Sequence, residues 1–278
     1  MPFRTKLTKA ETQLAASLRA SPGRIYARAE LAEHFYKARR EGVLAKHTKL
    51  DEFIEFLILR RHLLSITLNS KKYGKKITRY CVGPPSPFAL AASLRKSGYL
   101  SHGTAAYLHK VAKRPPDAMY LNVEQSAKTV RDTSLSQLGI DRAFAGKQRQ
   151  SNLSFENKEL MVTILAGKNT GRAGVEPIAH SAARGVQVTN LERTLIDIAV
   201  RPAYAGGIDQ VLAAYRAARE RVQEAVQRLC IQVVDELDLS HKANFDKCVD
   251  ENLSKAQVDI QALAAKKSGG PNLLGNNR

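Results

Sequence analysis

The period of the hydrophobic pattern changes between residues 48 and 82, and this change limits the fold more than any other feature. Residues 48–60 place Phe53, Leu57 and other apolar side chains at helical spacing, with charged residues between them. Residues 64–68 and 77–82 instead alternate apolar and polar side chains, as half-buried strands do, and a lysine-rich turn separates them. The pattern predicts a helix followed by a β-hairpin with a basic tip.

Two further helices are expected before this one. Thr8 and Glu11 have the spacing of a capping box at the start of one helical pattern, and residues 28–39 carry a second. Thr48 is the expected N-cap of the third helix. Three short helices and a terminal basic hairpin, in this order, predict a winged helix-turn-helix DNA-binding domain over residues 1–83.

The expected DNA contacts follow from how such a domain docks. The third helix would enter the major groove with its first residues at the base edges, and the hairpin would lie along the phosphate backbone. Glu52, on the outer face of that helix, would have to accept from a cytosine amino group or lie off the DNA. The predicted DNA-binding residues are Lys46, His47, Thr48, Lys49, Glu52, Arg60, Arg61, Lys71, Lys72, Tyr73, Lys75, Lys76 and Arg79.

The formal net charge of +18 is unevenly distributed along the 278 residues. Residues 1–83 carry 18 Lys and Arg against 7 acids, whereas residues 191–278 carry 12 of each kind. A basic front attached to a neutral end is expected when one part of a chain holds a polyanion, so double-stranded operator DNA is the predicted partner. An adaptor domain that binds an acidic protein stays open as an alternative.

The sequence after the hairpin predicts a second domain. Pro84, Pro85 and Pro87 stiffen the chain and mark a boundary. Helical and strand patterns then alternate, which predicts a mixed α/β domain over residues 84–222. Residues 223–278 are expected to form a helical extension that ends in a disordered tail. The predicted fold class is therefore mixed α/β (α+β), with the winged helix-turn-helix domain first.

Two stretches of the second domain resemble the AbiEi-type antitoxins of type IV toxin-antitoxin systems. They are YLSHGTAAYLH at residues 99–109 and VQVTNLERTLID at residues 186–197, followed by Arg201-Pro202 and by residues 205–207. The resemblance covers residues 5–222 in the order and kind of elements, whereas the sequence from residue 223 onward does not align.

This resemblance implies a bacterial, cytoplasmic regulator. It would repress its own operon through the N-terminal domain and neutralise a nucleotidyltransferase-like toxin through the C-terminal domain. A transcriptional regulator without an antitoxin role is the alternative. A homodimer on DNA is also expected, because inverted repeats suit paired proteins.

Short signals for an enzyme are weaker. Gly167-Lys168 lacks the glycine that a P-loop has five residues earlier, and His102 and His109 have no third metal ligand nearby in sequence. Asp117 and Glu124 are similar in type and order to the metal-binding carboxylates of restriction-type nucleases. Ser126, however, occupies the position where that motif has a lysine. We therefore expect no enzyme activity, cofactor or metal, and keep a nuclease as the alternative.

Two further expectations concern structure and compartment. Arg193 and Asp197, four residues apart on a helical pattern, should form an ion pair that locks the helix against the sheet or contacts a partner. The three cysteines are scattered and are expected to be reduced thiols. No apolar run is long enough to span a bilayer, and the N-terminus lacks the apolar core of a secretory signal, so a cytoplasmic protein is expected.

Overall fold

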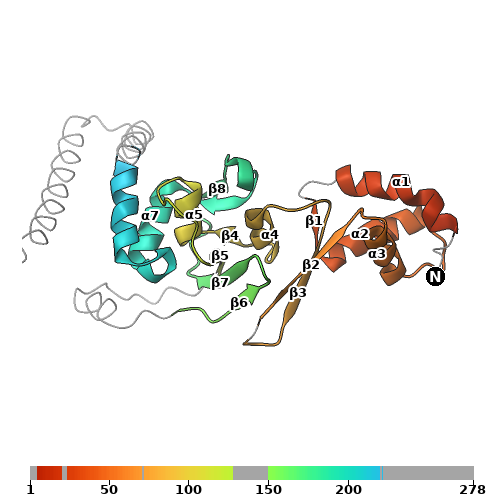
Figure 1. Ribbon diagram of the computed structural model, residues 1–278, viewed down its shortest axis with the longest axis horizontal. Helices are drawn as coiled ribbons and strands as arrows, with labels where there is room; N and C mark the ends of the chain where they lie inside the picture. The colour runs from red at the N-terminus through yellow and green to blue at the C-terminus, as the bar shows by residue number, and fades with distance from the viewer. Residues whose placement is uncertain (1–4, 21–23, 71, 128–149, 220, 222–278) are drawn as a thin grey trace, which may run out of the picture. The chain divides into compact units, whose positions relative to one another are not determined.

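The computed structural model describes residues 5–20, 24–70, 72–127, 150–219 and 221. These residues form a mixed α/β structure in which nine strands make one sheet, in the order β1-β3-β2-β6-β7-β5-β4-β9-β8 (Figure 1). The chain divides into two compact units, residues 1–222 and 223–278, and the described residues belong to the first. The predicted C-terminal extension and tail lie outside the described residues.

The three expected N-terminal helices are α1 (Thr5–Ala20), α2 (Arg28–Arg40) and α3 (Leu50–Leu59). Their apolar faces enclose one core, in which the rings of Phe35 and Phe53 lie 5.6 Å apart. Each helix buries a single stripe and leaves its charged residues outside, as the periodicity predicts.

The start of α3 differs from the prediction by one residue. The helix begins at Leu50 with Lys49 as its N-cap, and the Glu52 carboxylate accepts a hydrogen bond from the Lys49 amide at 3.2 Å. Thr48 is buried instead, and its amide donates to the carbonyl of Ala45 in a tight turn. A buried threonine in this turn cannot be the exposed cap that its residue type indicates.

The predicted hairpin is formed by β2 (Leu64–Asn69) and β3 (Lys76–Cys81), and the short β1 (Ile25–Tyr26) pairs with the outer side of β3. Gly74 supplies a positive φ of 60° in the connecting turn. Figure 1 shows the hairpin extending away from the three helices.

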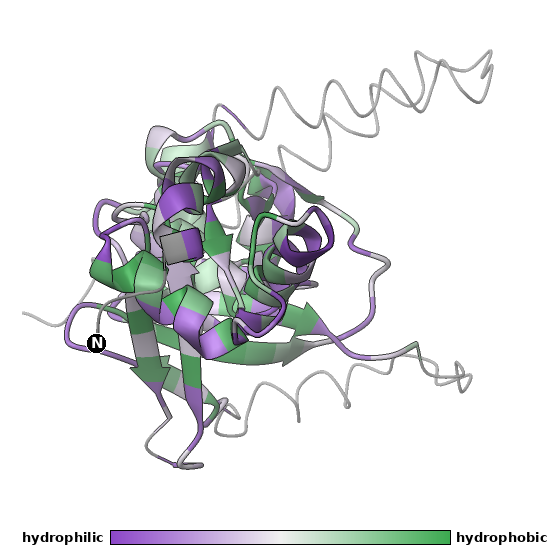
Figure 2. Ribbon diagram, turned by 90° about the vertical axis from the view of Figure 1, so that its right-hand side faces the viewer, coloured by the Kyte–Doolittle hydropathy of each residue, from purple (hydrophilic) through white to green (hydrophobic). Residues whose placement is uncertain are grey.

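The hairpin is also continuous with the rest of the sheet. Asn69 of β2 pairs with Glu156 of β6 (Ser154–Glu156), and the buried Leu68 lies in a core with Phe88 and Val162. Hydrophobic residues follow the strands from the hairpin into the rest of the sheet (Figure 2). The sheet therefore crosses the boundary expected after residue 83.

The remaining elements surround a parallel pair at the centre of this sheet. β5 and β7 run parallel with Leu121 opposite Ile164, and β4 runs parallel to β9 with Leu100 opposite Val188. The strands are β4 (Tyr99–Leu100), β5 (Met119–Glu124), β7 (Met161–Gly167), β8 (Val175–Pro177) and β9 (Gln187–Thr189), and the helices are α4 (Pro87–Ser93), α5 (His102–Leu108), α7 (Leu191–Val200), 3-10 turns at Ser181–Ala183 and Pro202–Ala205, and a helix over 208–219.

α7 begins where the sequence predicts. The Asn190 side chain accepts a hydrogen bond from the Arg193 amide at 2.9 Å and so caps the helix. α7 packs on the helix over 208–219 through a small core that includes Leu195, Ile198 and Val211. In the described part of the chain, no helix is long and apolar enough to cross a membrane.

Candidate functional site

The turn between α2 and α3 carries an exposed basic cluster. Of the residues predicted there, Lys46, His47 and Lys49 are exposed, and they lie at the amino end of α3. Thr48 is buried and does not lie on this surface, so its side chain is not placed for the predicted base contact. Sequence reasoning missed the last turn of α2, where three further exposed basic side chains add to the cluster: Lys37, Arg39 and Arg40.

Arg39 holds the turn in place. Its guanidinium donates to the backbone carbonyl of Lys46 and lies 6.0 Å from the centre of the Phe35 ring. The signal for this arrangement was present in the sequence as three basic residues in the last turn of a helix, where they also favour the helix dipole. Because Arg39 is engaged in this way, we define the turn cluster by the other five basic residues: Lys37, Arg40, Lys46, His47 and Lys49.

Two of the three acidic residues of α3, Asp51 and Glu52, have partners within the protein. Asp51 forms a 2.5 Å ion pair with Arg28 of α2, and the hydrogen bond from Arg28 lowers the pKa of the Asp51 carboxyl. Glu52 is engaged with the Lys49 amide at the helix start. The pairing of Asp51 with Arg28 reduces the repulsion that this face would otherwise exert on a phosphate.

The hairpin tip is the second exposed basic cluster. Lys72, Tyr73, Lys75 and Lys76 are all exposed, and the Lys72 ammonium lies 5.9 Å from the centre of the Tyr73 ring. The predicted Lys71 lies outside the described residues. We call Lys72, Lys75 and Lys76 the tip cluster.

The three predicted arginines have different surroundings. Arg60 lies 3.5 Å from Glu11 of α1 and over the Phe56 ring, whereas Arg61 is exposed with a positive φ of 60°. Arg79 is half-buried, and its guanidinium donates to the backbone carbonyls of Ser93 and Leu94. Burial lowers the pKa of Arg79. These bonds assign Arg79 a structural role between β3 and α4, in place of the predicted DNA contact.

The sequence around the tip cluster contains no acidic residues. Residues 56–116 contain twelve Lys and Arg and no Asp or Glu. The tip cluster lies inside this stretch, so no acidic side chain near it in sequence neutralises its lysines.

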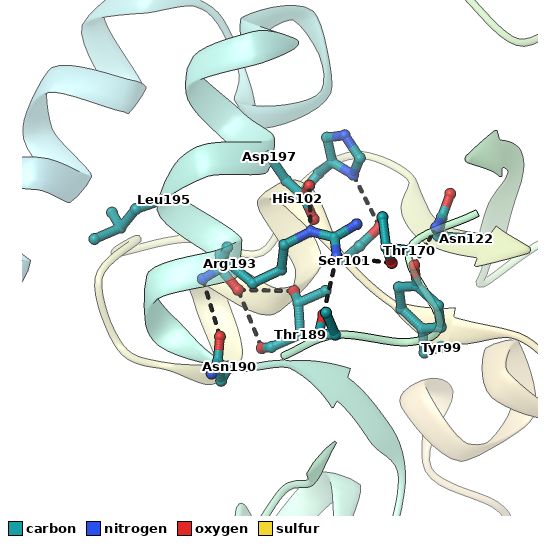
Figure 3. A network of polar contacts seen from close by, with 12 residues as sticks. Tyr99, Ser101, His102, Asn122, Thr170, Thr189, Asn190, Arg193, Leu195 and Asp197 are labelled. Carbon is teal, nitrogen blue, oxygen red and sulfur yellow. Dashed lines mark hydrogen bonds and ion pairs between the residues drawn. The ribbon is translucent and has the colours of Figure 1, made fainter. Parts of the chain in front are cut away.

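The predicted ion pair in the second part of the unit is present (Figure 3). Arg193 Nε lies 2.9 Å from Asp197 Oδ1, and the two side chains are only 18% and 15% exposed. Arg193 Nη1 also donates to the Thr170 hydroxyl at 3.2 Å and to the Ala173 carbonyl at 2.9 Å. Burial raises the pKa of the Asp197 carboxyl. The hydrogen bond from Arg193 lowers it, but the effect of burial is the larger one. The pair joins α7 to the loop after β7.

The same loop surrounds Glu124 at the end of β5. The Glu124 carboxylate accepts hydrogen bonds from the Tyr99 hydroxyl at 3.0 Å, from the Thr170 amide at 3.2 Å and from the Arg172 amide at 3.3 Å. Burial by itself would raise the pKa of the Glu124 carboxyl, but these hydrogen bonds outweigh it and lower the pKa. Asp117, the other carboxylate of the nuclease hypothesis, is exposed in the loop before β5.

The two histidines considered as metal ligands have separate partners. His102 is buried, its Nδ1 lies 2.8 Å from the Ser101 hydroxyl, and its ring meets the Tyr204 ring edge-on at 5.3 Å. Burial lowers the pKa of His102 to about 3, so the imidazole is neutral at pH 7. His109 lies 2.6 Å from the Thr189 carbonyl. Among the residues that the structure describes, no group of three or more His, Cys, Asp or Glu side chains is placed to hold a metal ion.

Cys81 is a free, buried thiol, and burial raises its pKa to about 11. It is therefore protonated at neutral pH, and the free thiol agrees with the predicted reduced state. Cys230 and Cys248 lie outside the described residues.

No protein-family model matches the chain, and no curated protein matches it. Among solved structures, the chain is similar to the crystal structure of the RV2827C protein from Mycobacterium tuberculosis, at 17% sequence identity and a TM-score of 0.40. The match covers 71% of this chain and 62% of that protein, so the chain spans less than two thirds of the length of the protein it matches.

Proposed function

We propose that this chain is a DNA-binding transcriptional repressor whose residues 1–83 form a winged helix-turn-helix domain. The observation that carries the proposal is the tip cluster: Lys72, Lys75 and Lys76 are exposed at the end of a hairpin that follows three helices. A hairpin of this kind positions a winged domain through phosphate contacts.

The turn cluster supports the same function. Lys46, His47 and Lys49 stand at the amino end of α3, where the backbone amides also favour an anion. In the proposed mechanism, these side chains contact base edges and the ends of α2 and the hairpin contact phosphates. Arg39 acts indirectly by holding the carbonyl of Lys46.

The antitoxin role is proposed on the AbiEi resemblance. The two stretches that carry the resemblance are neighbours in the fold, because Leu100 of the first lies opposite Val188 of the second in a parallel pair. In this proposal, residues 84–222 neutralise a nucleotidyltransferase-like toxin encoded beside the chain. A regulator without an antitoxin role would keep the DNA-binding half of the proposal.

We favour the repressor over a nuclease because the Glu124 oxygens already accept hydrogen bonds from Tyr99, Thr170 and Arg172. A metal ion at Glu124 would have to compete with these donors. Metal-dependent cleavage that is abolished in Asp117→Ala would reverse this preference.

The deciding experiment is a footprint of the purified chain on the DNA just upstream of its own gene, repeated at rising salt with a scrambled control. A discrete protected site that is absent from the control is expected. Uniform, salt-sensitive binding without a protected site would overturn specific repression. Growth rescue on co-expression with the neighbouring gene then tests the antitoxin role separately.

A further inference from the structure

The helix over 208–219 has two apolar sides, and only one is covered. Val211, Ala214 and Ala218 are buried against the second part of the unit. Ile208, Leu212 and Tyr215 follow each other in steps of four and three residues and so lie along another side, with exposed fractions of 64%, 41% and 40%. We call Ile208, Leu212 and Tyr215 the apolar stripe.

One residue of the apolar stripe is anchored to α7 by a hydrogen bond. The Tyr215 hydroxyl donates to the Leu195 carbonyl of α7 at 3.0 Å, and the next residue of α7, Ile196, is 59% exposed. Single exposed apolar residues are normal on monomeric proteins, whereas apolar residues that form a continuous exposed patch mark interaction surfaces.

The charges beside the stripe are self-complementary. Asp209 and Arg216 each follow a stripe residue directly, are exposed and stand seven residues apart, on the same edge of the stripe. If two copies of the helix pair in antiparallel orientation, Asp209 of each copy comes beside Arg216 of the other. Arg219, at the next stripe position, adds a second positive charge near the same Asp209. A two-fold symmetric pairing thus forms two ion pairs between Asp209 and Arg216, because each copy presents the same surface to the other.

We propose that the apolar stripe is a docking surface for a second copy of this chain, which pairs through it in antiparallel orientation. This inference names a surface for the expected homodimer and does not depend on DNA, so it can fail or hold independently of repression.

The first test is the sedimentation velocity of the full chain without DNA. The native chain is expected to sediment as a dimer, and Leu212→Glu as a monomer, because a carboxylate would then be buried in the apolar contact. Ala217→Glu is the matched control, since Ala217 is exposed on the opposite side of the same helix. A monomeric native chain, or a dimer that Leu212→Glu leaves intact, would overturn the proposal.

Exchanging the charges of the exposed Asp209 and Arg216 tests the antiparallel orientation of the two helices. Asp209→Arg and Arg216→Asp should each weaken dimerisation about tenfold, because each places like charges opposite one another. The double variant restores both pairs and should return the dissociation constant to that of the native chain. A double variant as weak as the single ones would overturn the antiparallel pairing.

Discussion

The guanidinium of Arg79 donates two hydrogen bonds to the backbone carbonyl of Ser93, from Nε at 3.1 Å and from Nη2 at 2.8 Å. These bonds satisfy a carbonyl at the end of α4 that has no partner within its helix. They connect the hairpin to the following helix across the boundary that prolines mark in the sequence.

Arg79→Ala should therefore lower the free energy of unfolding by about 1–3 kcal/mol, because partly buried carbonyls lose a charged donor. The salt dependence of DNA binding should stay that of the native chain. Urea unfolding and binding at several salt concentrations measure the two quantities. Unchanged stability with a reduced salt slope would show that Arg79 contacts phosphate instead.

Replacing Lys72, Lys75 and Lys76 by alanine should weaken binding to all DNA. The slope of the logarithm of the binding constant against that of the salt concentration should shrink by about 0.9 for each phosphate that the variant no longer neutralises. A triple variant of exposed lysines elsewhere controls for net charge: Lys96→Ala, Lys113→Ala and Lys158→Ala. Equal slopes in the two triple variants would remove the tip cluster from the DNA surface.

Lys46→Ala and Lys49→Ala should reduce specificity more than overall affinity, because side chains at the start of α3 are proposed to contact bases. The loss of discrimination at one base pair should be about 1–3 kcal/mol. Competition between the operator and single-base variants of it measures this change. Lys37→Ala, at the end of α2, serves as the comparison and should weaken binding to all sequences alike.

Arg193→Ala should lower the free energy of unfolding by about 3–5 kcal/mol, because it leaves the largely buried carboxyl group of Asp197 without its partner. Arg193→Ala combined with Asp197→Ala should cost less than the sum of the single changes, which a double-mutant cycle of unfolding free energies tests. Additive effects would contradict a direct pair. A stable Arg193→Ala variant that fails to neutralise the toxin would favour a partner contact.

His102 should make the fold sensitive to acid. Its folded-state pKa of about 3 lies below the ordinary value of 6.5, so the unfolded chain binds a proton more readily between these values. Stability should be complete above pH 6.5 and fall by at most about 1.4 kcal/mol for each pH unit below it. His102→Asn tolerates the positive φ of 52° and does not titrate, so its thermal unfolding should depend less on pH in this range. An unchanged pH dependence would show that other groups cause the acid sensitivity.

The partners of Glu124 show what residue type and spacing leave undetermined. Asp117 and Glu124 suit a metal motif in the sequence, but the folded chain brings Thr170 and Arg172 to the Glu124 carboxylate from a loop more than forty residues away. Similarly, the sequence groups Arg79 with the lysines of one basic hairpin. Only the hydrogen bonds from Arg79 to the end of α4 separate it from the exposed Lys72, Lys75 and Lys76.

The sequence by itself determined the features that depend on neighbours along the chain: the three helices, the hairpin, the Asn190 cap and the Arg193–Asp197 pair. Their signals are periodicity and short spacing, which act within a single element. Only the tertiary structure decided which polar side chains are buried and which partners they meet, as at Thr48 and Glu124. It also decided that β2 pairs with β6 through Asn69 and Glu156, because strand pairing and burial depend on contacts between residues that are far apart in the chain.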